Sequence, residues 1–306
     1  MNVLRAIASM AVCIVHLHYF IGLNAYPVSK LLTYGQQGVA IFFVVSGFII
    51  PYSLWNSNYT IRNFFRYLAR RSLRIDPPVL AIIMITILIT HEFNIVRILY
   101  NIFYLVPFSD SYKWYNGVFW TLGIEFQFYL IIGLTIGLII NKNIKVIVFF
   151  ILLISMTGYF IQLKNNYGFI LHSAHYFGFG ILTLLIYKKR ISILYGHILL
   201  FGLCFFLSCS ISILTGCIGY FSALAILHLS FRNIITDYFG RISYSLYLTH
   251  PLAGFYLADY LKHFQLNIYL LILILVILCT LIANLFYAAI ERPALKFSKR
   301  ISIKNG

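Results

Sequence analysis

Acidic residues are scarce in this sequence of 306 residues, which contains seven Asp and Glu against 23 Lys and Arg. Charged residues of both signs make up only 10% of the chain, whereas soluble domains carry about 25%. The hydrophobic fraction is 61%, and the apolar residues form long continuous runs. These features exclude a soluble domain. They also exclude a membrane β-barrel, because its strands alternate apolar and polar residues rather than forming long apolar runs. The composition therefore predicts an all-α polytopic membrane protein.

Cysteine is also scarce, and its pattern excludes two kinds of site. The five cysteines lie within apolar runs, at Cys13, Cys204, Cys209, Cys217 and Cys279. Their spacing matches no set of metal ligands and no disulfide framework. We interpret them as small membrane-embedded residues, and we expect no metal.

Ten apolar runs of about 17–25 residues are long enough to cross a bilayer. They lie near residues 3–23, 36–55, 76–93, 117–140, 144–163, 168–187, 193–212, 214–231, 242–261 and 267–290. A shorter apolar stretch at 98–108 predicts an interfacial or re-entrant segment. No long linker or internal repeat divides the chain, so residues 1–306 form one domain of about ten transmembrane helices.

The basic residues alternate between the two sides of these runs. Eighteen lie on the side of the N-terminus, and five lie on the other: Lys30, Arg97, Lys113, Lys164 and Lys262. The positive-inside rule then predicts a multi-pass protein of the cytoplasmic membrane with both termini inside. The net charge of +16 comes from basic residues between the spans, where the positive-inside rule places them beside a lipid bilayer. No nucleic-acid partner is therefore expected.

Arg5 and His16 lie in the first predicted span. Eleven residues of helix place their side chains within about 20° of one face and about 16 Å apart. Ionisable groups inside a membrane are functional candidates. The alternative is a histidine that merely hydrogen-bonds between helices. His18, about 200° around the helix from His16, is expected near the outer interface.

Glu125 is an acid well inside the fourth predicted span, and Tyr129 shares its helix face. Such a carboxylate must be paired, protonated or exposed to a wet cavity. A catalytic or binding role and a structural hydrogen bond between helices both remain open.

The ninth predicted span carries a polar stripe formed by Ser243, Tyr247 and His250. Pro251 cannot donate to the carbonyl of Tyr247, which predicts a kink there. A broken helix of this kind either lines a cavity or simply packs in the bundle.

In the second predicted span, small residues at Gly38, Ser46 and Gly47 permit close helix packing, or they form the wall of a ligand site.

Five arginines precede the third predicted span without an acid among them: Arg62, Arg66, Arg70, Arg71 and Arg74. They suit a basic helix on an anionic lipid surface, a polyphosphate ligand, or both. Pro77 and Pro78 predict that the span begins there, because the first helical turn tolerates proline.

Six motifs follow one another along nearly the full chain. They are Leu4–Ala8 with His16, Gly38–Phe48, Arg70–Pro77, Trp120–Tyr129, Ile242–His250 and Glu291–Pro293. In this order they resemble the acyltransferase 3 family of integral membrane proteins. Asn2 departs from the family pattern, which usually has an aspartate there.

The resemblance implies transfer of an acyl group, commonly acetyl from acetyl-CoA, to a hydroxyl of a glycan or glycolipid. Arg5 and His16 match the family's paired arginine and histidine, Arg71 and Arg74 its essential arginines, and Glu125 its intramembrane acid. We expect Arg70, Arg71 and Arg74 to bind the phosphates of acyl-CoA.

His16 is expected to act as a general base on the acceptor hydroxyl, or to accept the acyl group covalently. Tyr247, His250 and Ser46 are expected to bind substrate. The alternative function is a transporter or flippase for a glycan or lipid-linked sugar. A third possibility is a non-catalytic partner of a polysaccharide synthase.

Overall fold

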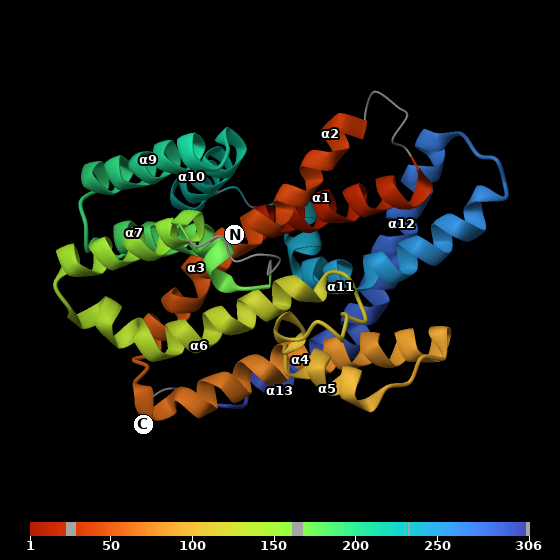
Figure 1. Ribbon diagram of the computed structural model, residues 1–306, viewed down its shortest axis with the longest axis horizontal. Helices are drawn as coiled ribbons and strands as arrows, with labels where there is room; N and C mark the ends of the chain where they lie inside the picture. The colour runs from red at the N-terminus through yellow and green to blue at the C-terminus, as the bar shows by residue number, and fades with distance from the viewer. Residues whose placement is uncertain (23–28, 161–167, 230, 232, 304–306) are drawn as a thin grey trace.

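The computed structural model describes residues 1–22, 29–160, 168–229, 231 and 233–303. The described residues form helices and no β-strand, so the predicted all-α fold is confirmed (Figure 1). The longer helices are α1 (Asn2–Ile21), α3 (Gly38–Asn56), α4 (Phe64–Thr90), α6 (Phe119–Asn141), α7 (Ile144–Phe160), α8 (Ala174–Tyr187), α9 (Ile193–Ser210), α10 (Ile213–His228), α11 (Ile234–Lys262) and α12 (Ile268–Phe286).

Short helical segments connect them. They are α2 (Ser29–Thr33), η2 (Tyr34–Gln37), η3 (Ile61–Asn63), α5 (Ile95–Ile102), η4 (Val106–Phe108), η5 (Ile170–Ser173), η6 (Tyr287–Glu291) and α13 (Arg292–Ser298). Among them, η6 is a single π-helical turn.

Within the described residues, each of the ten predicted spans overlaps one long helix, and residues 23, 161–163 and 230 of these spans lie outside the described residues. Among the described residues, seven helical stretches are both long and apolar enough to cross a membrane. They are Asn2–Ile21, Ser29–Asn56, Ile61–Thr90, Phe119–Asn141, Ile170–Tyr187, Ile193–Ser210 and Ile268–Ser298. The chain is therefore a polytopic membrane protein. The side on which its termini lie stays a prediction.

The third span begins earlier than the sequence indicated. Helix α4 runs without a break from Phe64 to Thr90, and Pro77 and Pro78 lie inside it rather than in its first turn. The arginine segment and the predicted span are thus one helix. Proline costs a helix the hydrogen bond to the residue four positions earlier, but the 27-residue helix continues through it. Tyr244 of α11 contacts this region, because its hydroxyl donates to the carbonyl of Ile75 at 3.1 Å.

The stretch between α4 and α6 contains α5, which is exposed along one apolar face. Asn94 caps this helix by accepting a hydrogen bond from the backbone N–H of Arg97. An amphipathic helix of eight residues is too short to span a bilayer. It suits the interfacial segment predicted from residues 98–108.

Helix α1 is central to the arrangement, because it packs against α3, α11 and α12 (Figure 1). Glycine permits two close approaches of α3. A Cβ at Gly38 would strike the carbonyl oxygen of Ala8 on α1, and a Cβ at Gly47 would strike the backbone of Phe177 on α8. The packing role of these glycines is confirmed.

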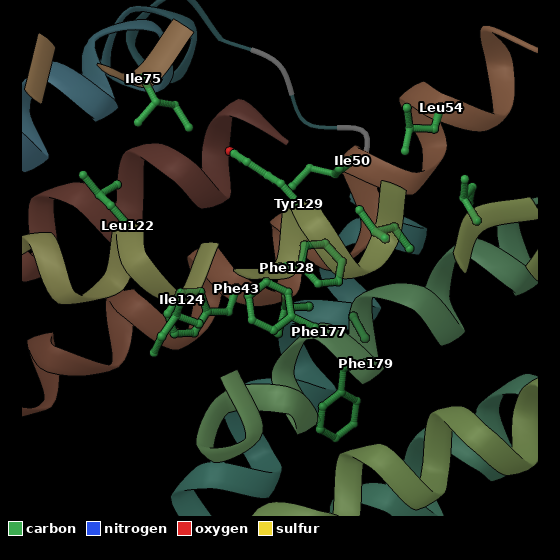
Figure 2. Packing of buried hydrophobic residues seen from close by; sticks show 14 of the residues in the cluster. Phe43, Ile50, Leu54, Ile75, Leu122, Ile124, Phe128, Tyr129, Phe177 and Phe179 are labelled. Atoms are coloured by element: carbon green, nitrogen blue, oxygen red, sulfur yellow. The ribbon is translucent and has the colours of Figure 1, made fainter. Parts of the chain in front are cut away.

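Aromatic side chains fill the core between α3, α6 and α8. The rings of Phe128 and Phe177 stack with centroids 4.2 Å apart, and Phe43 lies 5.0 Å from Phe177 (Figure 2). This cluster packs the three helices against one another. Phe43 also reaches the cavities described next.

Candidate functional site

Three cavities lie along α1. The N-terminal cavity, of about 530 Å³, is lined by Asn2, Arg5, Arg74, Arg241 and Glu291, among others. The arginine cavity, of about 280 Å³, is lined by Arg5, Arg71, Arg74, Glu125 and Ser46, among others. The histidine cavity, of about 360 Å³, is lined by His16, Gln36, Gln37, Trp120 and Tyr176, among others.

The N-terminal and histidine cavities lie at opposite ends of α1. The first turn of α1 and the first turns of α11 line the N-terminal cavity. The later part of α1 lines the histidine cavity, together with the starts of α3, α6 and α8. Arg5 and Arg74 line both the N-terminal and the arginine cavities, so these two side chains mark the boundary between them.

The arginine cavity carries an excess of positive charge. Arg5, Arg71 and Arg74 all reach it, and Glu125 is the acid in its lining. The salt bridge found in the described part of the chain joins Arg97 to Glu92 elsewhere. Three guanidinium groups without a salt bridge favour an anionic ligand, because arginine binds phosphate oxygens bidentately.

Two tyrosines of the core hold Arg71. Its guanidinium carbon lies 5.7 Å from the ring centroid of Tyr67 and 5.4 Å from that of Tyr129. Cation–π contacts of this kind orient the planar guanidinium as well as stabilise it. Arg71 is thus held by neighbours rather than free to turn toward solvent.

Glu125 is held by two hydroxyl donors. Its Oε1 accepts hydrogen bonds from Tyr129 at 2.6 Å and from Ser46 at 3.2 Å. Ser46 is therefore a polar member of the cavity wall, whereas its neighbour Gly47 serves packing. The carboxyl group joins α3 and α6 and lines the same cavity as the arginines.

The N-terminal cavity holds a buried acid. Glu291, which is 2% exposed, lies at the end of the π-helical turn η6. Its Oε2 accepts a hydrogen bond from the backbone N–H of Ser245 at 3.1 Å and another from the hydroxyl of Ser245. Asn2 donates from its amide to Asp237 at 2.8 Å. An ionised aspartate at position 2 could not donate that bond.

The histidine cavity combines polar and aromatic groups. The amides of Gln36 and Gln37, the indole of Trp120 and the phenol of Tyr176 surround the same space as His16. The Nδ1 atom of His16 lies 2.8 Å from the carbonyl oxygen of Val12. His18 is buried on another side of α1, with its Nε2 2.9 Å from the hydroxyl of Ser29.

Three side chains line both the arginine and the histidine cavities: Val39, Phe43 and Tyr247. The hydroxyl of Tyr247 lies 2.8 Å from that of Thr121, and its ring packs edge-to-face against Phe42 at 5.7 Å. We call Val39, Phe43 and Tyr247 the partition, because they separate the arginines from the imidazole.

The structure brings most of the predicted site residues together. The arginine cavity gathers six of them, namely Arg5, Ser46, Arg71, Arg74, Glu125 and Tyr247. His16 lies beyond the partition. Arg70 does not line any of the three cavities, and His250 is fully buried against His16 rather than in a cavity wall.

Several lining residues were not singled out from the sequence. Gln36, Gln37, Trp120 and Tyr176 line the histidine cavity, and Tyr244 lines the arginine cavity. The two adjacent glutamines at the start of an apolar run were a usable signal, because amides are costly to place beside lipid. The aromatic residues gave no comparable signal in a chain that is 18% aromatic.

Comparison with known proteins identifies the family of the chain. Residues 1–288 match a family of sequences described as an acyltransferase domain. The chain belongs to the acyltransferase 3 family. It is also similar to Nodulation protein 10 of Rhizobium leguminosarum bv. viciae, with 32% identity over 42% of this chain and 41% of that protein. The chain thus matches less than half the length of this curated relative. No solved structure matches the acyltransferase.

Proposed function

We propose that this acyltransferase moves an acyl group, which we take to be acetyl, from cytosolic acyl-CoA to a hydroxyl of a surface or secreted glycan. One observation carries the proposal: an imidazole and a cluster of guanidinium groups line neighbouring cavities on the two sides of one partition. Family membership supports acyl transfer, and the cavities support the choice of donor and acceptor.

The donor enters at the arginine end. Coenzyme A carries several phosphates, and Arg5, Arg71 and Arg74 have no salt-bridge partner among the described residues. We assign the phosphates to Arg71 and Arg74, while Arg5 binds the chain that leads toward His16. Arg5 and His16 are about 16 Å apart along α1, so an extended thioester arm is needed to cover that distance.

The acceptor enters at the histidine end. Sugar hydroxyls need donors and acceptors, which the amides of Gln36 and Gln37 provide in the histidine cavity. Trp120 and Tyr176 offer flat aromatic surfaces beside them. This combination suits a glycan better than an apolar acceptor.

His16 acts as the general base. It removes the proton from the acceptor hydroxyl as the oxygen attacks the thioester carbonyl carbon. The carbon–sulfur bond then breaks, and the protonated imidazole returns its proton to the departing thiolate. The products are the acylated glycan and free coenzyme A. A positioned base of this kind contributes about 10²–10⁴-fold to the rate.

The distribution of basic residues supports a place in the cytoplasmic membrane with both termini inside. In that orientation the N-terminal cavity faces the cytosolic pool of acyl-CoA, and the histidine cavity faces outward. The acyl group, rather than the whole donor, then crosses the partition.

The test uses the full-length protein in lipid nanodiscs. Acetyl-CoA is supplied with a panel of oligosaccharides, and both the release of free thiol and the mass of the glycan are measured. We expect thiol release to require the glycan and the glycan to gain one acetyl mass. Thiol release without glycan modification in every pairing would overturn the proposal, as would transport of an unmodified glycan into sealed vesicles.

A further inference from the structure

The imidazole of His16 contacts a second imidazole from another helix. The Nε2 atom of His250 on α11 lies 3.3 Å from the Nδ1 atom of His16 on α1, and the two ring centroids are 4.9 Å apart. His250 has no exposed surface and lines none of the three cavities. His250 therefore does not contact substrate in those cavities, although it contacts His16, which lines the histidine cavity.

The hydrogen bonds assign the proton on each ring. The Nδ1 atom of His250 lies 2.8 Å from the carbonyl of Leu246, and the Nδ1 atom of His16 lies 2.8 Å from the carbonyl of Val12. Carbonyl oxygens only accept, so both Nδ1 atoms carry the proton. In a neutral His250 ring the Nε2 atom then has a lone pair.

That lone pair faces the Nδ1–H of His16. The His16 proton is thus shared between the carbonyl of Val12 and the Nε2 atom of His250. The Nε2 atom of His16 is left with the free lone pair. A general base needs one unprotonated ring nitrogen, and in this tautomer that nitrogen is Nε2.

The backbone of α11 places the His250 ring. Its Nδ1 atom lies 2.8 Å from the carbonyl oxygen of Leu246, one turn earlier on the helix. Pro251, the next residue, leaves the carbonyl of Tyr247 without its helical N–H donor. The bond to Leu246 anchors the imidazole on the helix backbone while its Nε2 atom points across to α1.

We propose that His250 is a positioning residue for His16: it accepts the Nδ1 proton, fixes the basic nitrogen on the other side of the ring, and stabilises the imidazolium formed when His16 takes a proton. This inference rests on the proposed function. It replaces the substrate-binding role that the polar stripe of the ninth span predicted for His250.

Two substitutions separate this role from simple packing. His250→Gln keeps an acceptor oxygen near the position of Nε2, whereas His250→Leu fills similar space without an acceptor. Thr249→Val is the matched control, because Thr249 is buried on the same helix and its hydroxyl bonds only within it, to the carbonyl of Ser245.

We expect His250→Leu to lower kcat by about 10- to 100-fold, part of what a positioned base contributes, with an unchanged KM for acyl-CoA. His250→Gln should recover most of this loss, and Thr249→Val should behave as the wild type. Full turnover in His250→Leu, or equal loss in the Gln and Leu variants, would overturn the inference while leaving the proposed function intact.

A second measurement does not depend on turnover. Nitrogen-15 spectra of the histidine-labelled protein report which ring nitrogen of His16 carries the proton. We expect the proton on Nδ1 in the wild type and a mixture of tautomers in His250→Leu. A wild-type His16 protonated on Nε2 would refute the inference, whereas an inactive wild type with the expected spectrum would count against the proposed function alone.

Discussion

Arg5 and His16 lie on one face of α1 and line cavities at its two ends. Arg5 borders the arginine-lined space, and His16 borders a space rich in amides and aromatic rings. Because one helix carries both side chains, their separation is set by the helical rise. The relative position of anion site and base therefore does not depend on a loop.

Removing the imidazole tests the base directly. His16→Ala should lower kcat by about 10²–10⁴-fold, since a general base contributes that much, with little change in the KM for acyl-CoA. Thiol release and glycan mass measure the outcome. His228→Ala is the control, because His228 is exposed at the end of α10 and stacks on His197. Retained acetylation in folded His16→Ala would disprove the mechanism.

Arg71 and Arg74 should act on donor affinity. Arg71→Ala or Arg74→Ala should raise the KM for acyl-CoA by about 10- to 100-fold, because a hydrogen bond to a charged group contributes about 1.5–3 kcal/mol. Arg71→Lys should not restore affinity, because a lysine cannot repeat the planar contacts with Tyr67 and Tyr129.

The control for this pair is Arg66→Ala on the exposed part of the same helix. It should leave the KM unchanged and weaken only the association with anionic lipid. If Arg66→Ala and Arg71→Ala changed the KM equally, a general surface charge would explain the arginine segment.

Replacing Glu125 should lower activity more than replacing Ser46, whose hydroxyl donates to it. Glu125→Ala removes the acceptor of the hydroxyls of Tyr129 and Ser46. We expect kcat/KM to fall by about tenfold or more, since an unsatisfied buried group costs about 1–3 kcal/mol. Ser46→Ala should have a smaller effect, because Tyr129 still donates to Glu125. The reverse order of the two effects would contradict this account.

Gly38 should be intolerant of any side chain. Gly38→Ala places a Cβ against the backbone carbonyl of Ala8, which cannot move away without shifting α1. Overpacking of this kind costs about 1–3 kcal/mol, so the midpoint of thermal unfolding in nanodiscs should fall. Gly137→Ala is the control, because a Cβ there would meet no atom within 4 Å. Equal midpoints for the two variants would show that the helices adjust freely.

The sequence predicted those features of the site that depend on a single helix. Arg5 and His16 share a face because of helical periodicity alone, and Glu125 meets Tyr129 because they are one turn apart. The hydropathy of the chain predicted the helical class and a span overlapping each long helix, although not where α4 begins. These inferences required no knowledge of the partner helix.

Properties set by two helices were not accessible in this way. Arg70 and Arg71 are neighbours in sequence, yet only Arg71 lines the cavity, where its guanidinium packs over the ring of Tyr129 on α6. His16 and His250 meet across 234 residues, and no local pattern predicts that contact. Local preference predicts a helix start at Pro77 and Pro78, whereas α4 continues through both prolines.

The continuity of α4 links the arginines to the lipid. The helix has 27 residues, but its apolar part after the arginines, residues 77–90, is only about 21 Å long, which is less than the roughly 30 Å hydrocarbon thickness of a typical bilayer. The bilayer around a short apolar stretch thins, or the flanking side chains extend to the interface, to match its length. Hydrophobic mismatch would then set the height of Arg71 and Arg74 above the acyl chains, so the length of the surrounding lipid tails becomes a control on donor capture.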